Sequence, residues 1–157
     1  MTALWQAIVD DSIDEARPLF FPESAYLQMK TGVISDPASD YANRLIAFYG
    51  LDIGAYHSLL TSEGTGGTLV DVLVDPTYAT WIAPGQCENR IGYWHLPGVR
   101  LVYDVDSVEY SFAVASLISW RATWYVVHLG PNPRPQNVGT VDQPSLGAGA
   151  PGPPGGC

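Results

Sequence analysis

Basic residues are scarce in this chain, which has seven Lys and Arg against sixteen Asp and Glu and a formal net charge of −9. Its only lysine is Lys30. Nucleic acids and anionic membrane surfaces attract proteins through clustered Lys and Arg, and the sequence has no such cluster. We therefore predict neither a nucleic-acid partner nor binding to an anionic membrane.

Cysteine is equally scarce, because the chain has only Cys87 and Cys157. No Cys-x-x-Cys pair or Cys/His cluster occurs, so we predict no metal site, and nothing in the sequence calls for a cofactor. The two cysteines either form a disulfide or remain a lone thiol and an exposed chain end, and spacing does not decide between these. A nucleophilic Cys87 is disfavoured, because the neighbouring Glu88 would not lower its pKa.

Long apolar runs and catalytic motifs are also missing. No run of 18 apolar residues occurs, which excludes a predicted transmembrane helix. The first residues lack a basic segment and do not resemble a signal peptide, so we expect either a cytoplasmic protein or a mature exported form. There is no Gly-x-Ser-x-Gly elbow, and the glycine-rich segment 64–67 lacks the lysine of a phosphate-binding loop. The sequence therefore assigns no reaction.

The composition changes at Gly130, after which 13 of the last 27 residues are Pro or Gly. Such a segment buries too little apolar surface to offset the entropy of ordering it. We predict a single folded domain over residues 1–130 and a disordered tail over 131–157.

The first half of the chain has helical periodicity. The expected helices are residues 4–16, 22–30 and 36–60. Asp36 suits the N-cap of the longest helix, and Pro37 suits its first turn. Gly50 and Gly54 are expected to weaken or kink that helix.

The second half alternates as strands do, with an aromatic-rich closing hairpin. The expected strands are residues 68–74, 78–82, 91–96, 100–105, 109–120 and 123–129. We expect turns at Pro97–Gly98, within 104–107 and at Arg121–Ala122. Helices followed by a meander predict an α+β domain, with helices on one face of a curved antiparallel sheet. Such a cone-like sheet can hold a ligand in its mouth.

The element order and the hairpin of residues 118–129 resemble the nuclear-transport-factor-2-like (cystatin-like cone) superfamily. Residues 19–22, 89–95 and 124–130, together with the Pro/Gly tail, also resemble exported actinobacterial proteins of the mycobacterial type. The resemblance implies a cone-like fold and a homodimer through the open sheet face. It leaves function open, because the superfamily includes isomerases, dehydratases and inert binding modules.

The residues we single out as ligand-binding are Asp71, Tyr93, His95, Trp124 and His128. Strand alternation places His95 on the face of Tyr93, and His128 on the face of Trp124. If both faces line the concave side, the two histidines flank a pocket and are acid–base candidates. Otherwise each histidine makes one structural hydrogen bond at a sheet edge.

Asp71 interrupts an aliphatic strand on the same face as Leu69 and Leu73. Pointing inward, it would be a buried carboxylate with a raised pKa and a candidate general base. Pointing outward, it would belong to the polar face of a half-exposed strand. His57, near the end of the long helix, is expected to be structural.

Two functional hypotheses remain. The first is a non-catalytic exported or cell-envelope module that binds an apolar small molecule or a protein partner, with the tail as a spacer. The second is a small cone-fold lyase or isomerase that acts on a hydrophobic substrate through Asp71, Tyr93, His95 or His128.

Overall fold

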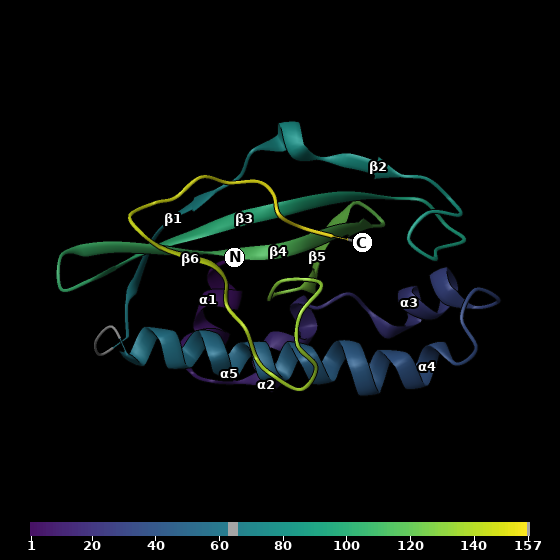
Figure 1. Ribbon diagram of the computed structural model, residues 1–157, viewed down its shortest axis with the longest axis horizontal. Coiled ribbons are helices and arrows are strands. Elements are labelled where there is room, and N and C mark those ends of the chain that lie inside the picture. Colours follow the sequence, from purple (N-terminus) through teal and green to yellow (C-terminus); the bar gives the residue numbers. More distant parts are fainter. Residues whose placement is uncertain (63–65, 157) are drawn as a thin grey trace.

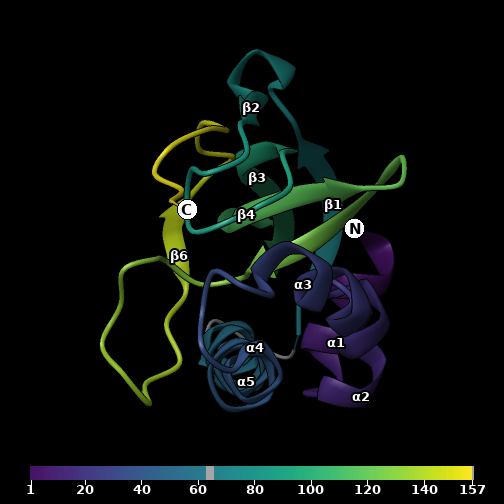
Figure 2. The ribbon, with the colours of Figure 1, turned by 90° about the vertical axis from the view of Figure 1, so that its right-hand side faces the viewer.

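A computed structural model describes residues 1–62 and 66–156, and its helices lie on one side of a six-stranded antiparallel sheet that does not close (Figures 1 and 2). The helices are α1 (Thr2–Val9), α2 (Ile13–Ala16), α3 (Glu23–Lys30), α4 (Pro37–Asp40), a π-helical turn η2 (Tyr41–Ile46) and α5 (Ala47–Ser62), with short 3₁₀ turns η1 (Arg17–Leu19) and η3 (Pro76–Tyr78). The strands are β1 (Thr68–Leu73), β2 (Thr80–Ile82), β3 (Tyr93–Val105), β4 (Val108–Trp120), β5 (Thr123–His128) and β6 (Asp142–Leu146). The predicted α+β class and antiparallel sheet are confirmed.

Local capping explains how the helices begin and end. The expected helix 4–16 is two helices, because Asp11 has a φ of 49° and the Ser12 hydroxyl then accepts a hydrogen bond from the Glu15 N–H. Asp36 caps α4 as predicted and accepts from the Ser39 N–H at 3.0 Å. The irregularity in the long helix is the π-helical turn η2, which precedes the expected kink sites at Gly50 and Gly54.

Strand β3 runs without interruption through Pro97 and Gly98, so the turn predicted there is wrong. Gly98 has a φ of +64°, and its carbonyl accepts a hydrogen bond from the Gly152 N–H at 2.9 Å. A Cβ at Gly98 would lie 1.8 Å from the Gly152 oxygen. The glycine therefore allows the tail to dock on the strand. The predicted hairpin turn at Arg121–Ala122 is confirmed, with both residues at positive φ.

The predicted disordered tail is wrong for residues 131–156, which return to the sheet. Figure 2 shows this segment descending beside α5 and then rising to the edge of the sheet, where β6 pairs with β4. The Asp52 carboxylate on α5 pairs with Arg134 and accepts from the backbone N–H groups of Gly130 and Thr140. The composition of the tail could not reveal this, because the anchoring groups belong to the domain.

Two further side chains hold the returning segment. The Tyr56 hydroxyl lies 2.7 and 2.8 Å from the carbonyl oxygens of Ala113 and Leu129, and it accepts a hydrogen bond from the Asp142 N–H. Arg100 donates to the Gln143 carbonyl and the Ser145 hydroxyl. Buried polar atoms without a partner in the described chain remain on four side chains, Arg100, Arg134, Asp142 and Gln143. Anchoring the segment through polar groups therefore leaves some buried donors and acceptors without a hydrogen bond, which is unfavourable.

Aromatic side chains fill the space between the helices and one end of the long β3–β4 pair. Trp5 of α1 contacts Tyr103, with ring centroids 5.2 Å apart. Tyr56 of α5 meets Phe112 edge to face at 4.7 Å. This end of the sheet is a packed core. The other end, near Tyr93, is the region described next.

Candidate functional site

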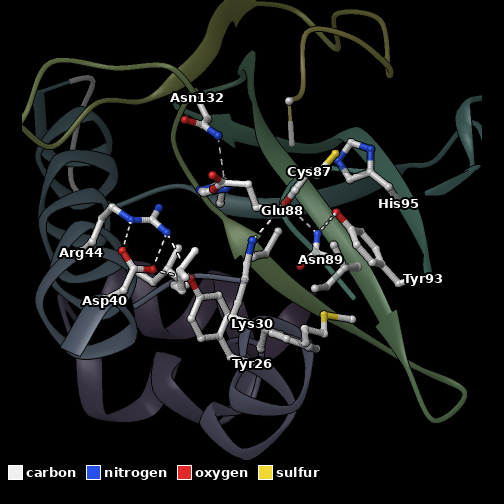
Figure 3. Close-up of a pocket in the computed structure, with 18 residues that line it drawn as sticks. Tyr26, Lys30, Asp40, Arg44, Cys87, Glu88, Asn89, Tyr93, His95 and Asn132 are labelled. Carbon is white, nitrogen blue, oxygen red and sulfur yellow. Dashed lines mark hydrogen bonds and ion pairs between the residues drawn. The ribbon is translucent and has the colours of Figure 1, made fainter. Parts of the chain in front are cut away.

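A cavity of about 430 Å³ lies between α3, the α4–η2 segment and the ends of β3, β4 and β5 (Figure 3). Its apolar lining consists of Phe21, Met29, Ile34, Leu45, Ile118 and Val127. Its polar lining consists of Tyr26, Lys30, Asp40, Arg44, Glu88, Asn89, Tyr93, His95, His128 and Asn132. Cys87 and Gly156 complete it. A mixed lining of this kind is typical of sites that orient small molecules.

Three of the five predicted site residues, Tyr93, His95 and His128, line this cavity together. Trp124 does not, because its side chain is 44% exposed and borders a separate hollow beside Leu4. A register shift between β4 and β5 explains the separation. Leu117 pairs with Val126 whereas Ser116 pairs with His128, so the strand alternation expected from Trp124 to His128 is broken.

Asp71 also lies away from the cavity. It is exposed on β1, where its carboxylate accepts a hydrogen bond from the Val72 N–H at 2.7 Å. The inward-facing alternative is therefore wrong, and Asp71 is not positioned as a general base for this cavity. His57 is structural, as expected, but it serves another helix: its Nδ1 lies 3.1 Å from the Ile8 and Val9 carbonyl oxygens at the end of α1.

The two histidines in the cavity have polar partners and neutral rings. The buried His95 has its Nε2 3.0 Å from the Ser116 hydroxyl, and burial lowers its pKa. Burial lowers the pKa of His128 to about 4, and its Nε2 lies 3.3 Å from the Asn132 side-chain amide. Both rings are thus uncharged at neutral pH and can donate or accept a hydrogen bond. The pKa of His128, about 4, is too low for an efficient acid–base catalyst at this pH.

A second polar group in the cavity escaped the sequence analysis. Arg44 donates to Asp40 through Nε at 2.7 Å and Nη2 at 2.6 Å, and the Tyr26 hydroxyl also donates to Asp40. The Arg44 hydrogen bonds hold the pKa of Asp40 below its usual value, and burial raises that of Tyr26. The one available signal was the helical i, i+4 spacing of Asp40 and Arg44, which also occurs on ordinary exposed helix faces.

Lys30 extends from α3 into the cavity between this group and the β3 side (Figure 3). Its ammonium donates to the Cys87 carbonyl at 3.0 Å. Within the described residues, no carboxylate lies within ion-pair distance of it. The side chain is half-buried, and burial lowers the pKa of its amine.

The loop of Cys87 and Glu88 forms the rim, with both residues at positive φ. Cys87 is disulfide-bonded, which removes it as a nucleophile. The other cysteine in the chain, Cys157, lies outside the described residues, so whether the two cysteines pair with each other stays open. The neighbouring Gly156 lines the cavity and accepts a hydrogen bond from Ser116 at 3.3 Å.

The arrangement favours binding through directed polar groups. Over residues 1–62 and 66–156, no cluster of three His, Cys, Asp or Glu side chains is placed to hold a metal ion. No helix in the same residues is long and apolar enough to span a membrane. The cavity offers hydrogen-bonding groups, two cations, two carboxylates and an apolar surface.

No family model, curated protein or solved structure matches this chain. Its function must therefore be argued from the geometry of the cavity.

Proposed function

We propose that this protein is a non-catalytic binding module that holds a small amphipathic molecule in the cavity between α3, η2 and the sheet. The observation that carries the proposal is the hollow itself: the same sheet that is filled by aromatic rings near Tyr103 encloses about 430 Å³ near Tyr93. That volume falls within the range of small-molecule sites. The proposal keeps the cone-like architecture of the nuclear-transport-factor-2-like superfamily as its structural premise.

The polar lining supports an oriented ligand. Tyr93, His95 and His128 present neutral hydrogen-bonding groups from the sheet, and Lys30 and Arg44 present charged groups from the helices. Apolar side chains between them supply a surface for the rest of the molecule. A ligand with one polar end and one apolar end would satisfy both kinds of group.

The alternative, a small lyase or isomerase acting on a hydrophobic substrate, has one observation in its favour. Tyr93, His95 and His128 share one cavity, as an acid–base mechanism would require. Against it, burial lowers the pKa of both histidines, and no carboxylate contacts either ring within the described chain. We therefore favour binding over catalysis.

We also propose that the protein acts outside the cytoplasm. The disulfide at Cys87 supports this, because disulfides persist in oxidising compartments.

We also propose a surface for a second copy of the chain. Trp81 and Trp94 are 51% and 48% exposed, and their rings lie 5.8 Å apart on neighbouring strands. If they form that surface, W94A will lower the dimer fraction measured by light scattering, whereas an equal fraction in W94A would reject it.

Native mass spectrometry of the unreduced protein tests the binding proposal. We expect an additional mass that is lost on denaturation. Val127→Phe, which places a larger side chain in the cavity, should abolish it, whereas Val70→Phe on the exposed face of β1 should retain it. A bare protein mass, or an adduct that survives in V127F, would contradict a ligand in this cavity.

A further inference from the structure

The only lysine of the chain lies in the cavity without an ion-pair partner among the described residues. Lys30 Nζ makes one hydrogen bond, to the Cys87 carbonyl, and lies 5.8 Å from the Tyr26 ring centroid. No carboxylate in the described residues lies within 4.0 Å of it. A half-buried ammonium has three N–H donors, so at least two remain for water or a ligand.

Arg44 retains donor capacity beside it. Two of its nitrogens are engaged by Asp40, and Nη2 also lies 3.3 Å from the Tyr26 hydroxyl. In the part of the chain that the structure describes, Nη1 has no hydrogen bond. Asp40 fixes the guanidinium through these hydrogen bonds, and its carboxylate also acts on Lys30 from beyond ion-pair distance.

Basic side chains act electrostatically on His128. After burial, the charges of Arg44, Arg134 and Lys30 lower its pKa further. The other acid of the lining, Glu88, is exposed at the rim and acts on Lys30 from beyond ion-pair distance. Apart from the exposed Glu88, the charged lining consists of the cations Lys30 and Arg44 and the carboxylate of Asp40, in a protein whose net charge is −9.

Apolar side chains line the same cavity as these cations. Met29 and Leu45 belong to the helices that carry Lys30 and Arg44, and Ile118 and Val127 belong to the sheet. A molecule that contacts both kinds of side chain needs an anionic group and a hydrocarbon or aromatic body. A simple anion would leave the apolar lining in contact with water, and a neutral lipid would leave Lys30 unpaired.

We infer that the ligand is a small amphipathic acid whose anionic group binds among Lys30, Arg44 and His128 and whose apolar body lies on Met29, Ile118 and Val127. This inference rests on the proposed function and adds the chemical class of the ligand. It explains why the single lysine is half-buried in a cavity. In contrast, surface lysines usually keep their ammonium groups in water.

Matched pairs of probes test the inference. The unreduced full-length protein is titrated by calorimetry with decanoate and 1-decanol, and with 2-naphthoate and 2-naphthamide. We expect each acid to bind about tenfold or more tightly than its neutral counterpart, as one charge-assisted hydrogen bond predicts. Lys30→Met should remove most of this preference and leave the neutral probes unaffected. Arg121→Met, which removes the same charge from an exposed turn, should change neither.

Each outcome has one meaning. Equal affinity for acid and neutral probes would overturn the acidic ligand and leave the binding module standing. Binding of none of the four probes would contradict the binding module itself. An unchanged preference in K30M would show that Lys30 does not select the acid. Because the wild-type comparison needs no variant, the inference stays testable even if K30M does not fold.

Discussion

The two ends of the β3–β4 pair differ in what lies between the sheet and the helices: one end is a packed core and the other encloses a cavity. At the Tyr103 end, aromatic rings from α1 and α5 fill the space against the sheet, and polar side chains such as Asp52 and Tyr56 bind the chain's own tail. At the Tyr93 end, the polar side chains converge on a cavity. The difference indicates where stability and where binding capacity reside.

This contrast is sharpest for the charged groups. The Asp52–Arg134 pair is almost fully buried and is surrounded by backbone donors from the tail. The half-buried Lys30 has no carboxylate within ion-pair distance in the described chain. Removing the Asp52 carboxylate should lower the stability of the fold strongly, whereas removing the Lys30 ammonium should not. The predictions below test this difference, beginning with the largest effect.

Asp52→Ala should lower the free energy of unfolding by about 3–5 kcal/mol, because it leaves Arg134 charged and buried without its partner. Urea denaturation followed by tryptophan fluorescence measures this. The double variant Asp52→Leu with Arg134→Met removes both charges and should cost clearly less than D52A alone. An equal or larger loss in the double variant would mean that the ion pair does not explain the anchoring.

Tyr56→Phe should cost about 2 kcal/mol, because the buried Asp142 N–H would lose its acceptor and the carbonyl oxygens of Ala113 and Leu129 would lose the one O–H donor that they share. Tyr49→Phe is the matched control, since its hydroxyl makes a single hydrogen bond to the Ala16 carbonyl. That variant should cost about 1 kcal/mol by the same measurement. If the two variants lose the same stability, Tyr56 does not act as a junction for the tail.

Acidification should destabilise the cavity end through His128. Its folded pKa of about 4 lies below the value of 6.5 for an unperturbed histidine. As pH falls from about 6.5 to 4, the unfolded chain therefore binds a proton that the folded chain does not, and stability falls by about 1–3 kcal/mol. His95 acts in the same direction. Denaturation of wild type and His128→Gln between pH 7 and about pH 4.5 should give a shallower loss in the variant; parallel profiles would contradict this role.

Lys30→Met should have the smallest effect on stability, a change within about 0.5 kcal/mol or a slight gain. The amine is desolvated, and that cost is not offset by an ion pair in the described structure. Urea denaturation beside D52A compares the two ends directly. A loss above about 2 kcal/mol would place Lys30 among the structural anchors and remove the contrast between the ends.

The sequence predicted local structure well where a signal and its partner lie close together. Asp36 and Pro37 start a helix as expected, and Arg121–Ala122 forms a tight turn. The errors arise where the partner is remote. Pro97–Gly98 has the composition of a turn, but the positive φ of Gly98 serves the approach of Gly152, 54 positions later (152 minus 98).

The tail and part of the cavity lining were mispredicted because the features that determine them lie outside the local residue pattern. The Pro/Gly content of a segment indicates how little apolar surface it can bury by itself. It carries no information about Asp52 and Tyr56 of α5, which hold the tail through hydrogen bonds to its backbone. Strand alternation brought Tyr93 and His95 to the cavity correctly. It misplaced Trp124 relative to His128, because a one-residue register shift leaves no mark in the residue pattern.

The most direct test of the account is the titration of the His128 ring, followed by NMR at its Cε1 proton, with and without 1-decanesulfonate, which stays anionic throughout the titration. The account predicts a pKa near 4 in the free protein, because the ring is buried and lies near Arg44 and Lys30. The sulfonate should raise that pKa by about one pH unit or more, and 1-decanol should not. Coincident titration curves in the presence of saturating sulfonate would contradict an anionic group bound beside Lys30, Arg44 and His128.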